Sequence, residues 1–276
     1  MKYVAFLDIL GFKEKLKTLN QAEAQRYIGD FSSTIYNIWR RNNPQTTLGY
    51  IVSDSLIIYS DGCPPNALRE LITMVRDICR EEFRLHSILI RGAIAKGEFD
   101  KLEARELWSL GKSLGIGQAY VDAYLLESAV KTVGIALSDA VYEDYQNAEL
   151  PIDDVLEETI KGDKRNIYRY LDADYLLEKD NLMLFISLAN KSRWLPHYYN
   201  ALYSAIAKEK SDKKIKQMFC NLIELISGEN YTENWRMVDL FIKNTFSDDV
   251  FSQYQKRFSK FLRESLQGFC NLEIQK

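Results

Sequence analysis

The chain has 276 residues, a formal net charge of −3 at pH 7 and 46 % hydrophobic residues. This length and apolar content suit one globular domain with an appendage, or two small domains. Charged residues of both signs are interspersed, which argues against a nucleic-acid-binding surface. The four cysteines are far apart and include no Cys-x-x-Cys pair, which argues against a disulfide framework or a zinc knuckle.

The N-terminus begins with an apolar segment that lacks the basic stretch and cleavage site of a signal peptide. No apolar run reaches the length that a bilayer-spanning helix requires. We therefore expect a cytoplasmic protein without stable membrane association.

The first predicted element is a strand that is buried on both faces. Residues Tyr3–Leu10 form a continuous apolar run that carries Asp8 near its end and is followed by Gly11. The length of this run and the glycine favour a strand over a helix. Residues 21–41 then predict a helix.

The next predicted elements are a hairpin and a second helix. Two short β-rich runs, Thr46–Val52 and Ser55–Tyr59, are separated only by Ser53 and Asp54, which is typical of a hairpin with a tight turn. The helix opens near Pro64, and its apolar residues recur every three or four positions, as expected for a helix packed on a sheet. These residues are Leu68, Leu71, Ile72, Val75, Ile78 and Cys79.

A strand, a helix and another strand follow. Ser87–Phe99 predicts a strand with a bend at Gly97, and Val133–Leu137 predicts a short strand with Ser138 as a cap for the next helix. A helical stripe lies between these strands and comprises Ala119, Ala123, Leu126 and Val130. Residues 154–172 are interpreted as an edge hairpin.

The segment Gly111–Gly117 is rich in glycine and invites a phosphate-loop interpretation. It lacks the Walker spacing and a preceding strand, however. We interpret it as a flexible turn that leads into the helix after it.

The order of the predicted elements indicates an α+β fold. Strand, helices, hairpin, helix, strand, helix and strand imply a ferredoxin-like sandwich, in which helices cover a central, mostly antiparallel sheet. We assign residues 1–172 to this domain. Residues 173–276 are helical and aromatic-rich, and we expect this C-terminal region to pack on the domain or on a dimer partner.

Asp8 and Asp54 are the first candidates for a functional site. Each has a structural alternative, because Asp8 can bond the backbone near Gly11 and Ser-Asp-Ser is ordinary turn chemistry. A buried carboxylate without a partner costs several kcal/mol, however, so Asp8 needs a cation, N–H donors or solvent. In a ferredoxin-like sheet the hairpin turn can lie beside the end of the first strand. Two carboxylates without histidine or thiolate suit Mg²⁺ or Mn²⁺.

The residues directly after Asp8 are candidates for phosphate binding. The backbone N–H groups of Leu10, Gly11 and Phe12 can surround a phosphate without adding charge, and Gly11 permits close approach.

Four motifs together resemble one enzyme family. The segment FLDILGF resembles the FxDIxGF motif of class III adenylate and guanylate cyclases, and SDS occupies the place of their second metal aspartate. IRGAIAKGEF resembles their RxGIxxG strand, and GQAYVDAYLLES resembles their GxxxNxAxRLE helix. The resemblance covers residues 3–140 in the correct order, which makes the joint match far more specific than any one motif. A more particular likeness, in Arg91–Ile94 and Ala123–Glu127, is to the bacterial pyrimidine cyclases of the Pycsar antiphage systems.

The resemblance implies a cyclase catalytic domain over residues 1–172 that forms a head-to-tail homodimer with its active sites at the interface. It implies two Mg²⁺ or Mn²⁺ ions per site, held by Asp8, Ile9 and Asp54. It also implies phosphate contacts from Arg91 and, through a late hairpin, from Lys164. Arg91 has a structural alternative, which is a salt bridge to a nearby glutamate.

The sequence departs from the family at the base-reading positions. Four residues before Asp54, adenylate cyclases carry lysine and guanylate cyclases carry glutamate, whereas this chain has Tyr50. A tyrosine ring can fill pocket volume and stack on a smaller base, while its hydroxyl bonds the base edge. The partner position falls near Leu114, which is also apolar, and both favour a pyrimidine. The alternative is that Tyr50 is a strand residue of the core.

The second departure removes an arginine. In the ungapped match, Val121 and Leu125 replace the asparagine and the transition-state arginine of the family, and a slip by one residue places Asp122 and Leu126 there. Arginine is absent in both registers, although such a cation is worth orders of magnitude in comparable phosphoryl transfers. Either another cation replaces the arginine, or the enzyme is slow, or the enzyme is inactive.

These observations predict a pyrimidine nucleotide cyclase that converts UTP to 3′,5′-cyclic UMP and pyrophosphate. The resemblance implies that this product is a second messenger for a separate effector in antiphage defence. The alternatives are a cytidylate cyclase that converts CTP to cyclic CMP, and a degenerate domain that binds nucleotide without turnover.

Overall fold

The computed structural model describes residues 1–107, 110–130, 133–160 and 163–191, together with positions 197, 198, 201, 202, 205, 211 and 214. Contacts divide the chain into two compact units, residues 1–130 with 134–170 and residues 131–133 with 171–276. The assignment of residues 1–172 as a catalytic domain stays a prediction. Across the described segments, no helix combines the length and the apolar character that crossing a membrane requires.

The first unit is built on a seven-stranded sheet with the order β2-β3-β1-β4-β7-β9-β8. One neighbouring pair, β4 with β7, is parallel, and the other pairs are antiparallel. The predicted α+β fold with a mostly antiparallel sheet is therefore confirmed. The strands are β1 Lys2–Ile9, β2 Thr47–Val52, β3 Ser55–Ser60, β4 Ile90–Gly97, β7 Ile135–Leu137, β8 Val155–Ile160 and β9 Asp163–Tyr168.

The first half of the unit has the ferredoxin-like connection. Its order is β1, α1 (Phe12–Leu16), α2 (Gln21–Asn42), β2, β3, α3 (Ala67–His86) and β4. The spatial order β2-β3-β1-β4 makes each β-α-β unit straddle a strand of the other, which is the split arrangement of this fold. The hairpin predicted over residues 154–172 is confirmed as β8 and β9 at the edge of the sheet.

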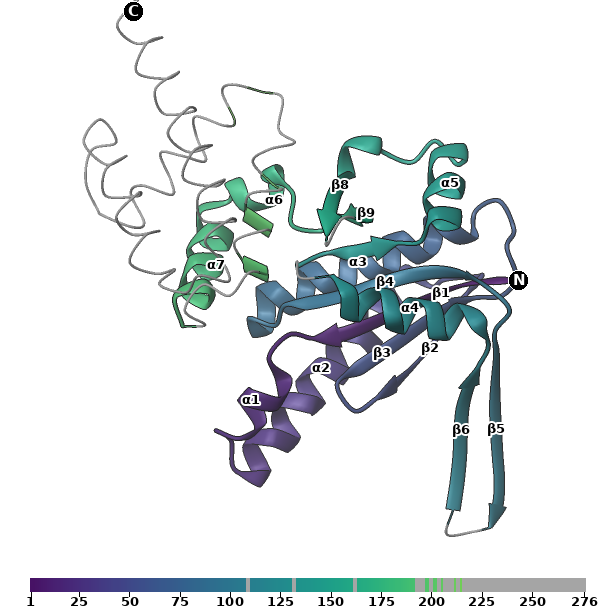
Figure 1. The fold of residues 1–276 in the computed structure, drawn as a ribbon. Helices are drawn as coiled ribbons and strands as arrows, with labels where there is room; N and C mark the ends of the chain where they lie inside the picture. Colours follow the sequence, from purple (N-terminus) through teal and green to yellow (C-terminus); the bar gives the residue numbers. More distant parts are fainter. Residues whose placement is uncertain are drawn as a thin grey trace, which may run out of the picture. The chain divides into compact units, whose positions relative to one another are not determined.

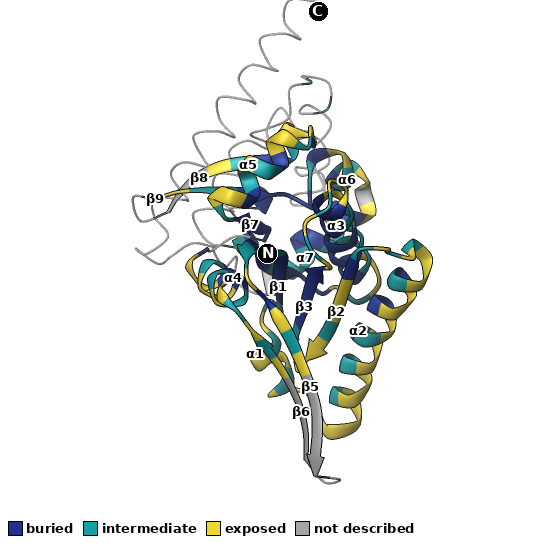
Figure 2. Cartoon of the chain, turned by 90° about the vertical axis from the view of Figure 1, so that its right-hand side faces the viewer, coloured by how far each residue is buried: buried dark blue, intermediate teal, exposed yellow. Residues whose placement is uncertain are grey.

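Helices cover both faces of the sheet (Figure 1). Helix α4 (Gln118–Ala129) packs Ala119 and Ala123 on one face, against Val4, Phe6 and Ile57. Helix α3 lies on the opposite face, with α2 beside it. Figure 2 shows β1 and β3 as the buried centre of this unit, whereas much of the edge strand β2 is exposed. Helix α5 (Asp139–Asn147) follows β7.

Strands β5 (Asp100–Leu107) and β6 (Leu110–Ile116) form a separate two-stranded sheet that projects from the unit (Figure 1). The interpretation of Gly111–Gly117 as a flexible turn was therefore wrong. The glycines made the segment look like a loop, but pairing such as Leu102 with Leu114 keeps its backbone extended. Gly115 also has a packing role, because a methyl group there would collide with the Tyr50 hydroxyl.

One strand boundary and one helix cap differ from the predictions. The strand predicted from Ser87 begins at Ile90, because Ser87 has a left-handed backbone conformation with φ 57° that ends α3. Ser138 does precede α5, but its side chain makes no capping hydrogen bond.

The described part of the second unit is helical, as predicted. Helix α6 (Ala173–Leu177) is capped by Asp172, whose side chain accepts a hydrogen bond of 2.8 Å from the backbone N–H of Tyr175, and α7 (Lys179–Lys191) follows. Most of the predicted helical region over residues 173–276 lies outside the described residues.

Candidate active site

Asp8 lies near the end of β1, on the face of the sheet that α4 covers. Side chains alternate between the faces of a strand, so Asp8 shares this face with Phe6 and Val4. Its cross-strand neighbours are Ser55 on β3 and Arg91 on β4. The Ser55 hydroxyl donates a hydrogen bond of 3.5 Å to Oδ1 of Asp8.

Asp54 lies in the two-residue turn between β2 and β3, which Ser53 makes possible with a φ of 57°. The backbone N–H of Ile9 donates a hydrogen bond of 3.3 Å to the carbonyl oxygen of Asp54, so the turn docks on the end of β1. The N–H and C=O of a strand residue point to the same side, so the Ile9 carbonyl also faces this turn. The structure thus brings Asp8, Ile9 and Asp54 together.

Arg91 is the cation of this cluster. One of its terminal nitrogens lies 3.5 Å from Oδ2 of Asp8, and its Nε forms an ion pair with Oε1 of Glu127 on α4. The Glu127 side chain is only 4 % exposed. The structural alternative for Arg91, a salt bridge to a glutamate, is therefore present, next to a contact with the predicted metal ligand.

The carboxylates of Asp8, Asp54 and Glu127 repel one another electrostatically. Burial raises the pKa of Asp8 to about 6, the nearby Asp54 and Glu127 charges add to the shift, and Arg91 counteracts it. Burial also raises the pKa of Glu127, and Arg91 again counteracts the shift. Arg91 thus pairs with two of these three acidic side chains, Asp8 and Glu127, and a further cation would relieve the excess negative charge.

The donor set fits a hard divalent cation. Two carboxylates and a backbone carbonyl offer only oxygen, which Mg²⁺ and Mn²⁺ prefer. The described segments contain no group of three or more His, Cys, Asp or Glu side chains suited to a metal ion. Bound phosphates and water would therefore have to supply the other ligands.

The proposed phosphate cradle is smaller than predicted. The N–H of Leu10 donates a hydrogen bond of 2.8 Å to the carbonyl oxygen of Leu89, so it is not available to a phosphate. The assignment of Leu10 to phosphate binding is therefore corrected. The hydrogen bond to Leu89 comes from a segment that is distant in the sequence, so the local motif does not reveal it. Gly11 has the left-handed φ of 78° that the turn requires, and Phe12 stacks on Tyr27 with ring centroids 6.2 Å apart.

Tyr50 lies on the same face of the sheet as Asp8. Its cross-strand neighbour is Ile57, two residues from Ser55. Nζ of Lys101 lies 4.7 Å from the centroid of the Tyr50 ring, and burial raises the pKa of Tyr50 to about 12. The ring also packs on the core cluster around Phe6, so the alternative of a core strand residue holds in part.

The hairpin residue that meets the tip of Tyr50 is Gly115, the neighbour of Leu114. Leu114 itself is 47 % exposed. Side chains alternate along a strand, so the Leu114 side chain lies on the face of the hairpin that points away from Tyr50.

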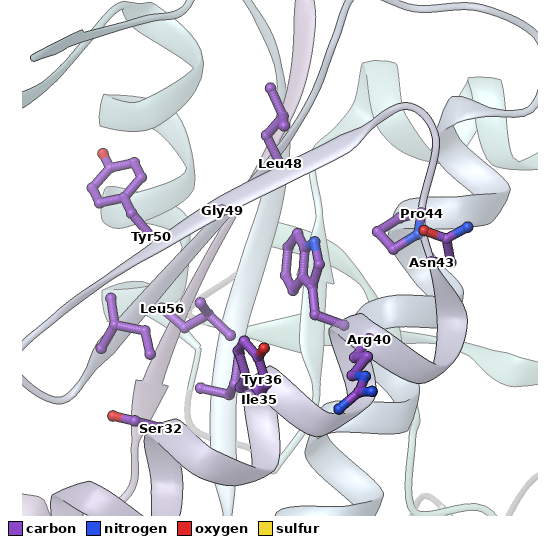
Figure 3. Close-up of a pocket in the computed structure, with 12 residues that line it drawn as sticks. Ser32, Ile35, Tyr36, Arg40, Asn43, Pro44, Leu48, Gly49, Tyr50 and Leu56 are labelled. Carbon is purple, nitrogen blue, oxygen red and sulfur yellow. The ribbon is translucent and has the colours of Figure 1, made fainter.

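A groove of about 670 Å³ lies on the other face, between α2 and β2. Figure 3 shows that the Tyr50 ring points away from Ile35 and Tyr36 of α2, which line the groove. Only the backbone side of Tyr50 borders this space, so the groove is separate from the Asp8 cluster.

Lys164 does not join the cluster within one chain. It lies near the start of β9 and pairs with Glu157 at 2.9 Å, with both side chains exposed. Register through β7 aligns Tyr168 with Gly92, next to Arg91. Lys164 is four residues further along β9, so on the order of 20 Å separates it from Asp8.

Helix α4 presents apolar side chains where the family motif has asparagine and arginine. Val121 is 45 % exposed and Leu125 is 59 % exposed. In the alternative register, Asp122 accepts a hydrogen bond of 2.6 Å from Gln118, and Leu126 packs on a core cluster. Neither register supplies a cation.

Two side chains were missed from the sequence. Lys101 belongs to none of the motifs or periodic segments of the sequence, so no local signal marks it. Glu127 could have been found, because it follows Ala119 and Ala123 at intervals of four and is an acid on a buried stripe, while Arg91 is a base in a buried strand.

The comparisons with known proteins give one kind of match. No protein-family model matches the chain, and neither does any curated protein. Among solved structures, the adenylyl cyclase CyaB from P. aeruginosa is 17 % identical, with a TM-score of 0.45, and the match covers 60 % of this chain and 92 % of that chain. The guanylate cyclase domain of RhGC from Catenaria anguillulae, in complex with GTP, is 17 % identical, with a TM-score of 0.46 and coverages of 60 % and 93 %.

A third match is the dimeric guanylyl cyclase domain of the RhoGC fusion protein from Blastocladiella emersonii. It is 15 % identical, with a TM-score of 0.46 and coverages of 60 % and 94 %. At these identities and TM-scores, the likeness carries no conclusion about activity or substrate.

Proposed function

We propose that this chain is a nucleotide cyclase of the class III type that converts UTP to 3′,5′-cyclic UMP and pyrophosphate. The observation that carries the proposal is the convergence of two motif aspartates that are 46 positions apart in the sequence. Asp8 and the Asp54 turn meet at one end of β1, and Arg91 stands opposite Asp8. The sequence motifs suggest the class III cyclase family. The cluster, which offers oxygen ligands and carries more acidic than basic side chains, supports that proposal.

Each residue of the cluster has a role in this proposal. Asp8, Asp54 and the Ile9 carbonyl hold the cations, and the N–H groups of Gly11 and Phe12 bind phosphate. When bound, two Mg²⁺ or Mn²⁺ ions would acidify the ribose 3′-hydroxyl and neutralise charge on the departing pyrophosphate.

Arg91 also serves the phosphates in this proposal. Among the described residues, its ion-pair partners are Glu127, which engages Nε, and Asp8, which engages one terminal nitrogen. The other terminal nitrogen is left for a phosphate oxygen.

Tyr50 supports a pyrimidine over a purine. Its ring fills space on the Asp8 face, and its hydroxyl lies against Gly115 of the hairpin, next to Leu114 in the chain. Neither side chain carries the charge with which the family reads adenine or guanine, and a smaller base fits the reduced volume. The choice of UTP over CTP, and a second-messenger role in antiphage defence with a separate effector, rest on the resemblance to the Pycsar cyclases.

A head-to-tail homodimer is part of the proposal. Val121, Tyr124 and Leu125 form an exposed apolar surface on α4, and Leu114 and Ile116 add apolar area on the hairpin. Such a surface favours association with a second copy. The partner's side chains would then complete the site, and its Lys164 can approach a triphosphate that is remote from the Lys164 of the same chain.

The proposal is tested by product analysis. The purified full-length chain is incubated with ATP, GTP, CTP or UTP and Mn²⁺, and the products are separated by chromatography and identified by mass spectrometry. We expect cyclic UMP and pyrophosphate from UTP. Cyclic CMP as the sole product would assign CTP instead, and cyclic AMP or cyclic GMP as the sole product would refute the pyrimidine assignment.

A second candidate function is nucleotide binding without turnover. It is favoured by one observation, the exposed Leu125 in place of the family's arginine. Calorimetry that detects metal-dependent UTP binding, together with no product over a long incubation, would support this candidate over the cyclase.

A further inference from the structure

Glu127 is an acidic residue on the buried stripe of α4. It follows Ala119 and Ala123 at intervals of four, and all three side chains face the sheet and are buried. A carboxylate in this position costs several kcal/mol unless a cation compensates it. Its compensating cation is Arg91, while the Ser128 hydroxyl lies 3.3 Å from its other oxygen and donates a hydrogen bond to it.

The two contacts of Arg91 are unequal. Its Nε lies directly against Glu127, whereas its terminal nitrogen is 3.5 Å from Asp8, which is long for a charged hydrogen bond. Glu127 is also the more buried partner, with 4 % of its side chain exposed against 22 % for Asp8. Coulomb attraction is stronger where water is excluded, so the guanidinium belongs mainly to Glu127.

We propose that Glu127 is a positioning residue that anchors Arg91 and so keeps the Asp8 carboxylate available for a divalent cation. The inference rests on the proposed function, because it assumes that Asp8 is a metal ligand. Without the anchor, the guanidinium would form a full ion pair with Asp8 and compete with the metal for the same oxygens. Glu127 touches neither substrate nor metal in this role and acts only through Arg91.

The experiment measures Mn²⁺ binding to the full-length chain by calorimetry, in the absence of nucleotide. In Glu127→Gln, which preserves the shape of the side chain, we expect the dissociation constant for Mn²⁺ to rise about tenfold to a hundredfold, as is usual for residues that support metal ligands. Thermal unfolding is recorded in parallel, so that loss of fold is not mistaken for loss of affinity.

Asp122→Asn is the matched control. It removes the same charge from the same helix, but Asp122 is partly exposed and bonds Gln118 instead of Arg91. We expect its dissociation constant for Mn²⁺ to stay within about twofold of the wild-type value, because a solvated charge is screened.

The double variant Arg91→Met with Glu127→Met separates anchoring from a purely structural role. An apolar pair of similar volume commonly replaces a buried ion pair without loss of stability. Because the competing guanidinium is gone, we expect the double variant to recover Mn²⁺ affinity to within about threefold of wild type. A role limited to packing predicts no such recovery.

Three outcomes would overturn the inference. The first is an unchanged dissociation constant in Glu127→Gln, and the second is a double variant that is folded but binds Mn²⁺ as weakly as the single variant. The third is a wild-type chain that binds no Mn²⁺, which would overturn the proposed metal site as well, whereas the first two leave that site intact.

Discussion

The two ends of the β1–β4 ladder both carry ionic side chains, but their charges are balanced differently. At one end, Tyr3 pairs with Lys96 across the strands, and Asp144 of α5 accepts from both, at 2.8 Å from the tyrosine hydroxyl and 2.6 Å from the lysine. At the other end, Arg91 stands opposite Asp8 at 3.5 Å.

The balance of charge distinguishes a structural site from a candidate functional one. Lys96 and Asp144 neutralise each other, and their hydrogen bond raises the pKa of Lys96. Around Asp8, the Arg91 guanidinium is shared with Glu127, and the pKa of Asp8 is raised by burial and by the nearby Asp54 and Glu127 charges. The charges at the first end balance without a further ion, whereas a cation at the second end would relieve the excess negative charge.

The largest effect is expected from Asp54→Asn. This substitution keeps the shape of the turn but removes the charge that we propose binds metal, and metal contributions of several kcal/mol correspond to a loss of turnover of about a thousandfold. The measurement is the rate of cyclic nucleotide formation from UTP with Mn²⁺, alongside circular dichroism.

Asp144→Asn is the matched control at the balanced end of the ladder. It leaves Lys96 without its carboxylate and is expected to lower the free energy of unfolding by about 2 kcal/mol, without changing Mn²⁺ affinity. If Asp54→Asn retained full turnover, or Asp144→Asn lost Mn²⁺ binding, the contrast between the two ends would not hold.

The next effect is the pH dependence of stability that Asp8 causes. The pKa of its carboxyl rises from 3.8 to about 6 on folding, so the folded chain retains a proton between these values that the unfolded chain has released. The contribution of the Asp8 carboxyl to the free energy of unfolding is therefore fully present below about pH 4. It is lost as the pH rises through about 6. At pH 7 the loss amounts to about 3 kcal/mol.

Asp8→Asn removes this titration. The free energy of unfolding is measured in urea with EDTA present, for the variant and for wild type. We expect the difference, variant minus wild type, to be about 3 kcal/mol larger at pH 7 than at pH 4. Equal differences at the two pH values would show that Asp8 is not destabilised in the metal-free fold.

Much of the fold could be predicted from the sequence because its signals are local. The apolar run that ends near Asp8 and the two-residue break at Ser53 and Asp54 specify a strand and a hairpin by themselves. The β5–β6 hairpin was missed because β6 contains Gly111 and Gly115, and its extended conformation comes from pairing with β5. In the sequence alone, Gly115 is typical of a loop. Its packing against the Tyr50 hydroxyl is seen only in the structure.

The site was predictable only in part, for the same reason. Asp8 and Asp54 could be paired because the fold brings a hairpin turn to the end of the first strand. That the N–H of Leu10 is used by Leu89, and that Arg91 is shared between Asp8 and Glu127, depends on side-by-side positions of distant segments. No spacing within one motif encodes which carboxylate a guanidinium meets.

The smallest effect on stability is expected from Lys164→Met. The pair of Lys164 with Glu157 is exposed, so its loss should change the free energy of unfolding by less than about 0.5 kcal/mol. If the lysine reaches a triphosphate across the dimer, however, the KM for UTP should rise about tenfold, because a charged contact to phosphate is lost.

Arg165→Met is the control, since Arg165 pairs with Asp163 on the same strand. Equal KM values for wild type and Lys164→Met would remove Lys164 from the site, and a tenfold rise in Arg165→Met as well would assign the effect to the charge of the hairpin instead of to one residue.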